Sequence, residues 1–102
     1  MRVAIYCRVD GGGSLEMRRA ALDMQRCELE HYAVEKGFQI SGYYEDNGFS
    51  GHDLSRPGLT QLRIDYDSGS FERVLVVNRN RLYRGNLWSE PHWPFPIYSL
   101  KQ

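Results

Sequence analysis

Apolar residues form three short runs that are separated by two stretches of helical periodicity. The first run covers residues 3–7 and precedes a glycine cluster, the second covers residues 38–45, and the third covers residues 73–77. A nearly continuous apolar run beside glycines is typical of a strand that is buried on both faces of a parallel sheet. The pattern therefore predicts three strands, of which the second is weaker because a serine and a glycine interrupt it.

Two amphipathic helices are predicted between these strands. The first begins after Ser14, whose hydroxyl can cap it, and ends at Gly37, with Leu22 and Leu29 on one apolar stripe. The second begins at Pro57, since proline is favoured in the first turn of a helix. Strand, helix, strand, helix, strand is a double βαβ unit. We therefore expect an α/β fold of three layers, with helices on both faces of a parallel sheet.

The composition changes after residue 85, where aromatic residues and three prolines follow one another closely. The prolines exclude a helix and disfavour a central strand. We expect residues 86–102 to form an extended arm on the domain of residues 1–85, against either the edge of the third strand or a second copy. The second copy is favoured, because a three-stranded sheet has little core to shelter four large aromatic side chains. These are Trp88, Trp93, Phe95 and Tyr98.

Bulk properties restrict the function classes. The chain of 102 residues is long enough for one small domain, and its formal net charge of zero gives no overall basic field. Cys7 and Cys27 lack the spacing of a metal site, so we expect reduced thiols in a cytoplasmic protein and no bound metal. No apolar run is long enough to cross a membrane, and the first residues do not resemble a signal peptide.

Charged residues gather where the predicted strands end. In an open α/β sheet, ligands bind outside the carboxyl ends of the strands. Guanidinium groups suit phosphate oxygens because they donate paired hydrogen bonds and stay charged. Solvated arginines at strand ends would give the same pattern, so position alone leaves both interpretations open. The residues expected at this edge are Arg8, Asp10, Asp46, Arg56, Arg79, Arg81 and Arg84.

Five motifs in order from the first residue to about residue 85 resemble the catalytic domain of serine site-specific recombinases, the resolvase/invertase family of mobile elements. An ordered set is far more specific than any one motif. The motifs are Tyr6-Cys7-Arg8-Val9, Leu22-Asp23-Met24-Gln25, the segment 42–51, Arg56-Pro57-Gly58-Leu59 and Arg81-Leu82-Tyr83-Arg84.

The resemblance implies a chemistry. In that family a serine at the end of the first strand attacks a DNA phosphodiester, and arginines stabilise the phosphate without a metal or a nucleotide cofactor. The resemblance places the phosphate-binding arginines at Arg8, Arg56, Arg81 and Arg84, with supporting residues at Gln25 and Asp46. It also implies that DNA and further copies of the chain are the partners.

Two departures from the family pattern fall at the predicted site. Asp10 stands where the family has its serine, and Asn80 stands where it has an aspartate before the arginine pair. A carboxylate that faces a phosphate adds repulsion where a neutral hydroxyl should attack. The family's further strands, its long dimerisation helix and its DNA-binding region are also replaced here by the aromatic arm. We therefore expect a truncated recombinase-like domain that is catalytically inactive.

Three functions remain open at this point. The domain can bind DNA or a recombinase partner without cutting, which predicts steep salt dependence. It can use Asp10 as the nucleophile of a phosphoryl transfer, although the paired acids that such enzymes use are missing around residue 10. Finally, it can be an interaction module or regulator of a mobile element whose arginines are relics. In that case the aromatic arm should form an interface instead of covering the domain's own core.

Overall fold

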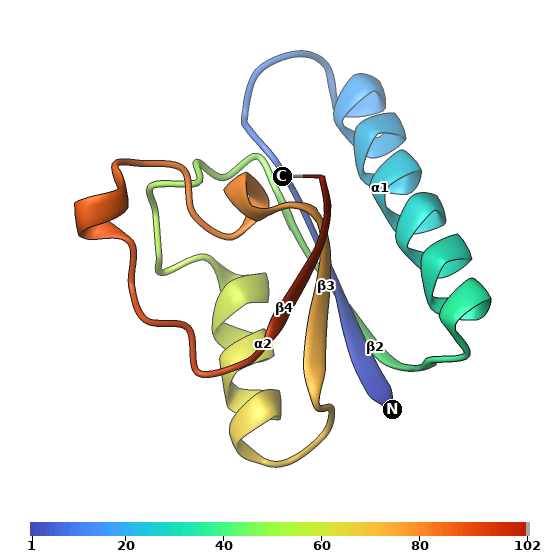
Figure 1. Ribbon diagram of the computed structural model, residues 1–102. Helices are drawn as coiled ribbons and strands as arrows, with labels where there is room; N and C mark the ends of the chain where they lie inside the picture. Colours follow the sequence, from blue (N-terminus) through green and yellow to red (C-terminus); the bar gives the residue numbers. More distant parts are fainter. Residues whose placement is uncertain (102) are drawn as a thin grey trace.

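The computed structural model describes residues 1–101, with the backbone alone at Leu87, and shows four strands and two main helices (Figure 1). Gln102, the last residue of the predicted arm, lies outside the described residues. The sheet has the order β2-β1-β3-β4, and each pairing is parallel. The elements in chain order are β1 (Arg2–Val9), α1 (Leu15–Lys36), β2 (Gln39–Asn47), α2 (Pro57–Asp67), β3 (Arg73–Asn78), the 3₁₀ turns η1 (Arg79–Arg81) and η2 (Leu87–Ser89), and β4 (Ile97–Lys101).

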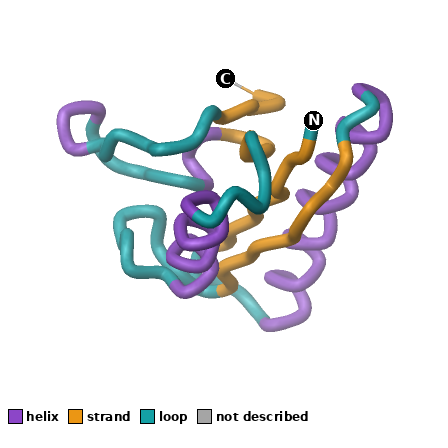
Figure 2. Tube along the Cα trace, turned by 90° about the horizontal axis from the view of Figure 1, so that it is seen from below, coloured by secondary structure: helices purple, strands orange, loops and turns teal. Residues whose placement is uncertain are grey.

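The two helices cover opposite faces of the sheet (Figure 2). The connection from β1 to β2 runs one way across the sheet, and the connection from β2 to β3 runs back past β1. Two crossovers of the same hand therefore place their helices on opposite faces. The α/β fold with three layers that the sequence predicts is confirmed.

Strand β1 lies at the centre of both cores. Val3 and Ile5 pack with Leu22 and Leu29 of α1, whereas Tyr6 packs with residues of α2 on the other face. All residues from 3 to 9 are buried, as the apolar run predicts. Both ends of α1 are also as predicted, since the hydroxyl of Ser14 accepts the N–H of Met17 and Gly37 has φ of 73°.

The sheet has four strands, so the prediction of three is wrong by one. Residues 97–101 of the predicted arm form β4, which pairs with β3 from Val74↔Ile97 to Asn78↔Lys101. The prolines do not prevent this, because the last of them, Pro96, precedes the strand and offers its carbonyl to the N–H of Val74. An edge strand needs only one ladder of hydrogen bonds, and β4 covers the edge of β3 that would otherwise be exposed.

Most aromatic side chains of the arm pack on their own domain. Phe95 is 3% exposed and lies in the core under α2, next to Tyr66 and Trp93. Tyr98 stacks on Phe38 on the opposite face of the sheet, at a ring distance of 5.9 Å. Trp88 alone among these aromatics is exposed, at 96%. The arm therefore extends the core, and the boundary at residue 85 stays a prediction. No helix within residues 1–101 has the length and apolar character needed to span a membrane.

We expect Phe95→Ala to lower the free energy of unfolding by about 3–4 kcal/mol, because it removes a buried aromatic ring from a packed core. Trp88→Ala is the matched control within the arm and should change stability by about 0.5 kcal/mol or less. Urea unfolding followed by circular dichroism measures both. Equal midpoints for the two variants would show that the arm is not part of the core.

Candidate functional site

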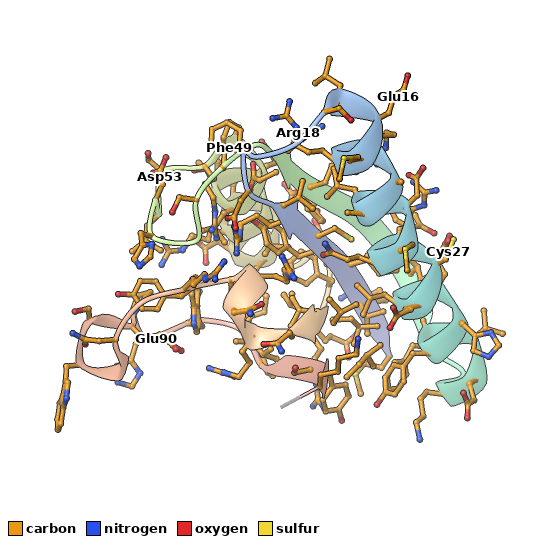
Figure 3. All side chains as sticks on the ribbon, turned by 90° about the horizontal axis from the view of Figure 1, so that it is seen from above. Glu16, Arg18, Cys27, Phe49, Asp53 and Glu90 are labelled. Atoms are coloured by element: carbon orange, nitrogen blue, oxygen red, sulfur yellow. The ribbon has the colours of Figure 1, made fainter. Side chains whose placement is uncertain are left out.

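The predicted site residues lie at the carboxyl edge of the sheet, which Figure 3 views from above. Arg18 of α1 and Phe49 of the loop after β2 mark two of the segments that meet there. The third segment is η1, which follows β3 directly. Segments far apart in the sequence thus surround the end of β1.

The guanidinium of Arg8 holds these segments together and is fully buried. Its Nε donates to the carbonyl of Arg81 at 3.0 Å, and its Nη2 donates to that of Asn80 at 2.9 Å. Its Nη1 donates to the carbonyl of Phe49 at 2.9 Å and to Oδ1 of Asp10 at 2.5 Å. Each nitrogen of Arg8 therefore already has an acceptor within the protein.

Asp10 bridges two arginines. One carboxylate oxygen accepts from Arg8, and the other accepts from Nη1 of Arg84 at 3.0 Å. The hydrogen bond from Arg8 lowers the pKa of the Asp10 carboxyl below its ordinary value of 3.8. The positive charges of Arg84 and Arg81 act in the same direction, and slight burial opposes them. The side chain of Asp10 is thus an anion at neutral pH.

The side chains of Gln25 and Arg81 fix the end of β1 from two sides. Oε1 of Gln25 accepts the backbone N–H of Arg8 at 3.2 Å, and Nε2 donates to the carbonyl of Arg8 at 3.0 Å. Arg81 donates to the same carbonyl at 3.1 Å. Burial, together with the charge of Arg8, lowers the pKa of Arg81. The amide oxygen of Asn80 and Nε of Arg81 are buried and lack hydrogen-bond partners within the described part of the chain.

Arg56 is a second fully buried guanidinium. It donates to the carbonyls of Ser50 and Leu82 and lies 5.7 Å from the ring centre of Tyr6. Its Nε is 3.8 Å from Oδ2 of Asp46. Burial lowers the pKa of Arg56. This arginine holds the loop before α2 against Leu82, the residue after η1, and presents no exposed surface to a ligand.

Asp46 caps α2 from outside the helix. Its carboxylate accepts the backbone N–H groups of Gly58 and Leu59 at 2.7 and 2.9 Å and the hydroxyl of Tyr6 at 2.6 Å. Arg56, at the N-cap position itself, makes no capping hydrogen bond. The close approach of α2 to the end of β2 requires glycine at residue 58, because a Cβ there would lie 2.5 Å from the carbonyl oxygen of Glu45. Two causes raise the pKa of Tyr6: burial, which is the larger, and the hydrogen bond to Asp46.

The structure therefore separates the predicted residues into two adjoining groups. One group, at the start of α2, consists of Arg56 and Asp46. The other group lies around the end of β1 and consists of Arg8, Asp10, Gln25, Asn80, Arg81 and Arg84. Arg84 is the most exposed of the four predicted arginines, with 60% of its side chain accessible.

Arg18 was not predicted to belong to the site. Its Nη1 donates to the carbonyl of Gly11 at 2.8 Å, and it lines a cavity of about 310 Å³ together with Asp10, Gln25 and Arg81. The signal was present in the sequence, because the first turns of a helix that follows a glycine loop lie beside the end of the preceding strand.

The fold and the motifs at the end of β1 define a recombinase-type catalytic domain. Residues 3–87 match the family described as "Resolvase, N terminal domain", and the chain belongs to that family.

Individual relatives agree with this assignment. The chain is 33% identical over 82 residues to a protein of Bacillus subtilis (strain 168) named "Putative DNA recombinase", a match that covers 80% of this chain and 16% of that protein. The solved N-terminal catalytic domain of TP901-1 integrase has 40% identity and a TM-score of 0.71, covering 83% of this chain and 60% of that one. The catalytic domain of IS1535 TnpA, an IS607-like serine recombinase, has 26% identity and a TM-score of 0.70, covering 97% of this chain and 70% of that one.

We expect Asp46→Asn to lower the free energy of unfolding by about 3 kcal/mol, because it leaves the charge of Arg56 buried without an anion. Asp67→Asn is the control, since Asp67 is an exposed aspartate at the other end of α2. It should change stability by about 0.5 kcal/mol or less. Chemical unfolding measures both variants, and a stability of Asp46→Asn within error of the control would rule out the capping and pairing role of Asp46.

Proposed function

We propose that this chain is a recombinase-type domain that binds DNA at the carboxyl edge of its sheet and does not cleave it. Membership of the resolvase family and its likeness to solved recombinase catalytic domains support the DNA partner. The observation that carries the loss of cleavage is the Asp10 carboxylate, which stands at the end of β1 and pairs with Arg8 and Arg84.

The chemistry of residue 10 opposes strand cleavage. Formation of a covalent DNA link requires a nucleophile that can approach an anionic phosphodiester. The carboxylate of Asp10 repels that anion, and both of its oxygens already accept hydrogen bonds from arginines. Ser14 is the hydroxyl that follows in the chain, but it caps α1 through the N–H of Met17. The same contacts oppose a phosphoryl transfer that uses Asp10 as nucleophile.

Exposed arginines at the same edge supply the DNA contacts in this proposal. Arg84 and Arg79 have 60% and 52% of their side chains accessible. Because the net charge of the chain is zero, attraction to DNA has to come from such a local cluster. Binding through phosphate contacts weakens steeply as salt increases.

The alternative of a pure interaction module receives less support. It requires the aromatic arm to form an interface, whereas Phe95 is buried and Trp93 and Tyr98 pack against the domain. Trp88 remains as the exposed aromatic residue of the arm. Self-association is part of our proposal and is supported by the outer edge of β4, which has no partner strand within residues 1–101. A cytoplasmic location is also part of it, consistent with two free cysteines.

The test is incubation of the protein with supercoiled and linear DNA, scored by native gels for retardation and by denaturing gels for covalent adducts. We expect retardation that falls steeply with salt, and no adduct. Arg84→Gln should weaken retardation several-fold, because each lost phosphate contact reduces affinity. Arg2→Gln is the control at the opposite end of β1, with the same change in charge.

Two results would contradict the proposal. A nuclease-resistant protein–DNA adduct that disappears in Asp10→Ala would show that Asp10 is a nucleophile. Equal losses of retardation in Arg84→Gln and Arg2→Gln would show that DNA does not bind at the carboxyl edge.

A further inference from the structure

We propose that the carboxylate of Asp10 is a built-in anion that occupies the phosphate position between Arg8 and Arg84 and excludes external phosphate from that one position, while the exposed remainder of the edge stays accessible. The inference rests on the proposed function, because it concerns the same site, and it adds a form of self-inhibition to it. It predicts that neutralising one side chain creates an anion site that the natural chain lacks.

The first support is the charge balance of Arg8. This guanidinium is fully buried, and the only carboxylate within ion-pair distance of it in the described residues is that of Asp10, at 2.5 Å. Its other hydrogen bonds go to backbone carbonyls, which carry no net charge. A buried charge without a counter-ion is strongly destabilising. Arg8 therefore needs an anion at this position, either from the chain or from a ligand.

The second support is the way in which the carboxylate is held. One oxygen of Asp10 accepts from Arg8 and the other from Arg84, so a single anion bridges a buried and an exposed guanidinium. Two oxygens of a phosphate can take the same two donors, because arginine binds carboxylate and phosphate with the same geometry. Asp10 thus stands in for an external ligand.

The third support is the space beside Asp10. The adjacent cavity of about 310 Å³ is also lined by Arg18 and Arg81, and Nε of each of these is buried without an acceptor among the described residues. The side chain of Asp10 is 48% accessible, so the position is open to solution. A tetrahedral anion that replaces the carboxylate finds room there, beside the side chains of two further arginines.

The consequence is a gain of binding when the charge of Asp10 is removed. In Asp10→Asn, Arg8, Arg81 and Arg84 lose their shared anion. The variant should unfold more easily than the natural chain in chloride, and inorganic phosphate should restore its stability by binding the folded state. The natural chain should respond little, because its carboxylate repels phosphate from the same position.

The experiment measures the affinity for inorganic phosphate at pH 7 and constant ionic strength, by calorimetry and by the shift of the thermal midpoint. We expect Asp10→Asn to bind phosphate about tenfold or more tightly than the natural chain, because one close like charge has been removed. Glu16→Gln removes the same charge from the exposed first turn of α1 and is the control. It should leave phosphate affinity unchanged.

Each outcome decides the proposal. Equal phosphate affinity in the natural chain and Asp10→Asn, or an equal gain in Glu16→Gln, would overturn it. If Asp10→Asn is unfolded in chloride, folding on addition of phosphate supports the proposal, and failure to fold at any phosphate concentration overturns it. DNA retardation by the natural chain separates the two proposals. If Asp10→Asn binds phosphate but the natural chain does not retard DNA, this inference is upheld and the proposed function is contradicted.

Discussion

The buried guanidinium of Arg8 is the constraint on which the carboxyl edge depends. A positive charge without solvent contact needs hydrogen-bond acceptors in fixed places and one anion close by. The chain supplies the acceptors as carbonyls of Phe49, Asn80 and Arg81, and the anion as Asp10. Segments that are distant in the sequence are thereby held around the end of β1. Residues that carry the family resemblance also hold the domain together.

Arg56, the second buried arginine, is also neutralised by a carboxylate that makes further structural contacts, at the start of α2. Asp46 pairs with Arg56 and caps the helix, so one carboxylate satisfies a buried charge and two backbone N–H groups. The match over residues 3–87 establishes the family of this chain, whereas the proposed loss of cleavage rests on residue 10.

Local patterns predicted most of the fold, and long-range contacts account for the rest. The double burial of β1, the caps of α1 and the proline start of α2 follow from neighbouring residues alone. Strand β4 was missed because the prolines dominate the pattern of the arm, and the strand begins only after Pro96. Sequence reasoning placed Asp10 beside the arginines and treated it as a repulsive group or, in the alternative, as a nucleophile, but not as a partner of Arg84. Its pairing with Arg84, 74 residues away, depends on the folded chain.

The most direct test of this account is a pH titration of the Asp10 carboxyl carbon by NMR in the natural chain. If the carboxylate neutralises Arg8 and Arg84, the pKa of Asp10 lies below its ordinary value of 3.8, because protonation has to break both contacts. A pKa at or above that value would mean that the arginines do not hold the carboxylate, and the account of a self-occupied site would be wrong.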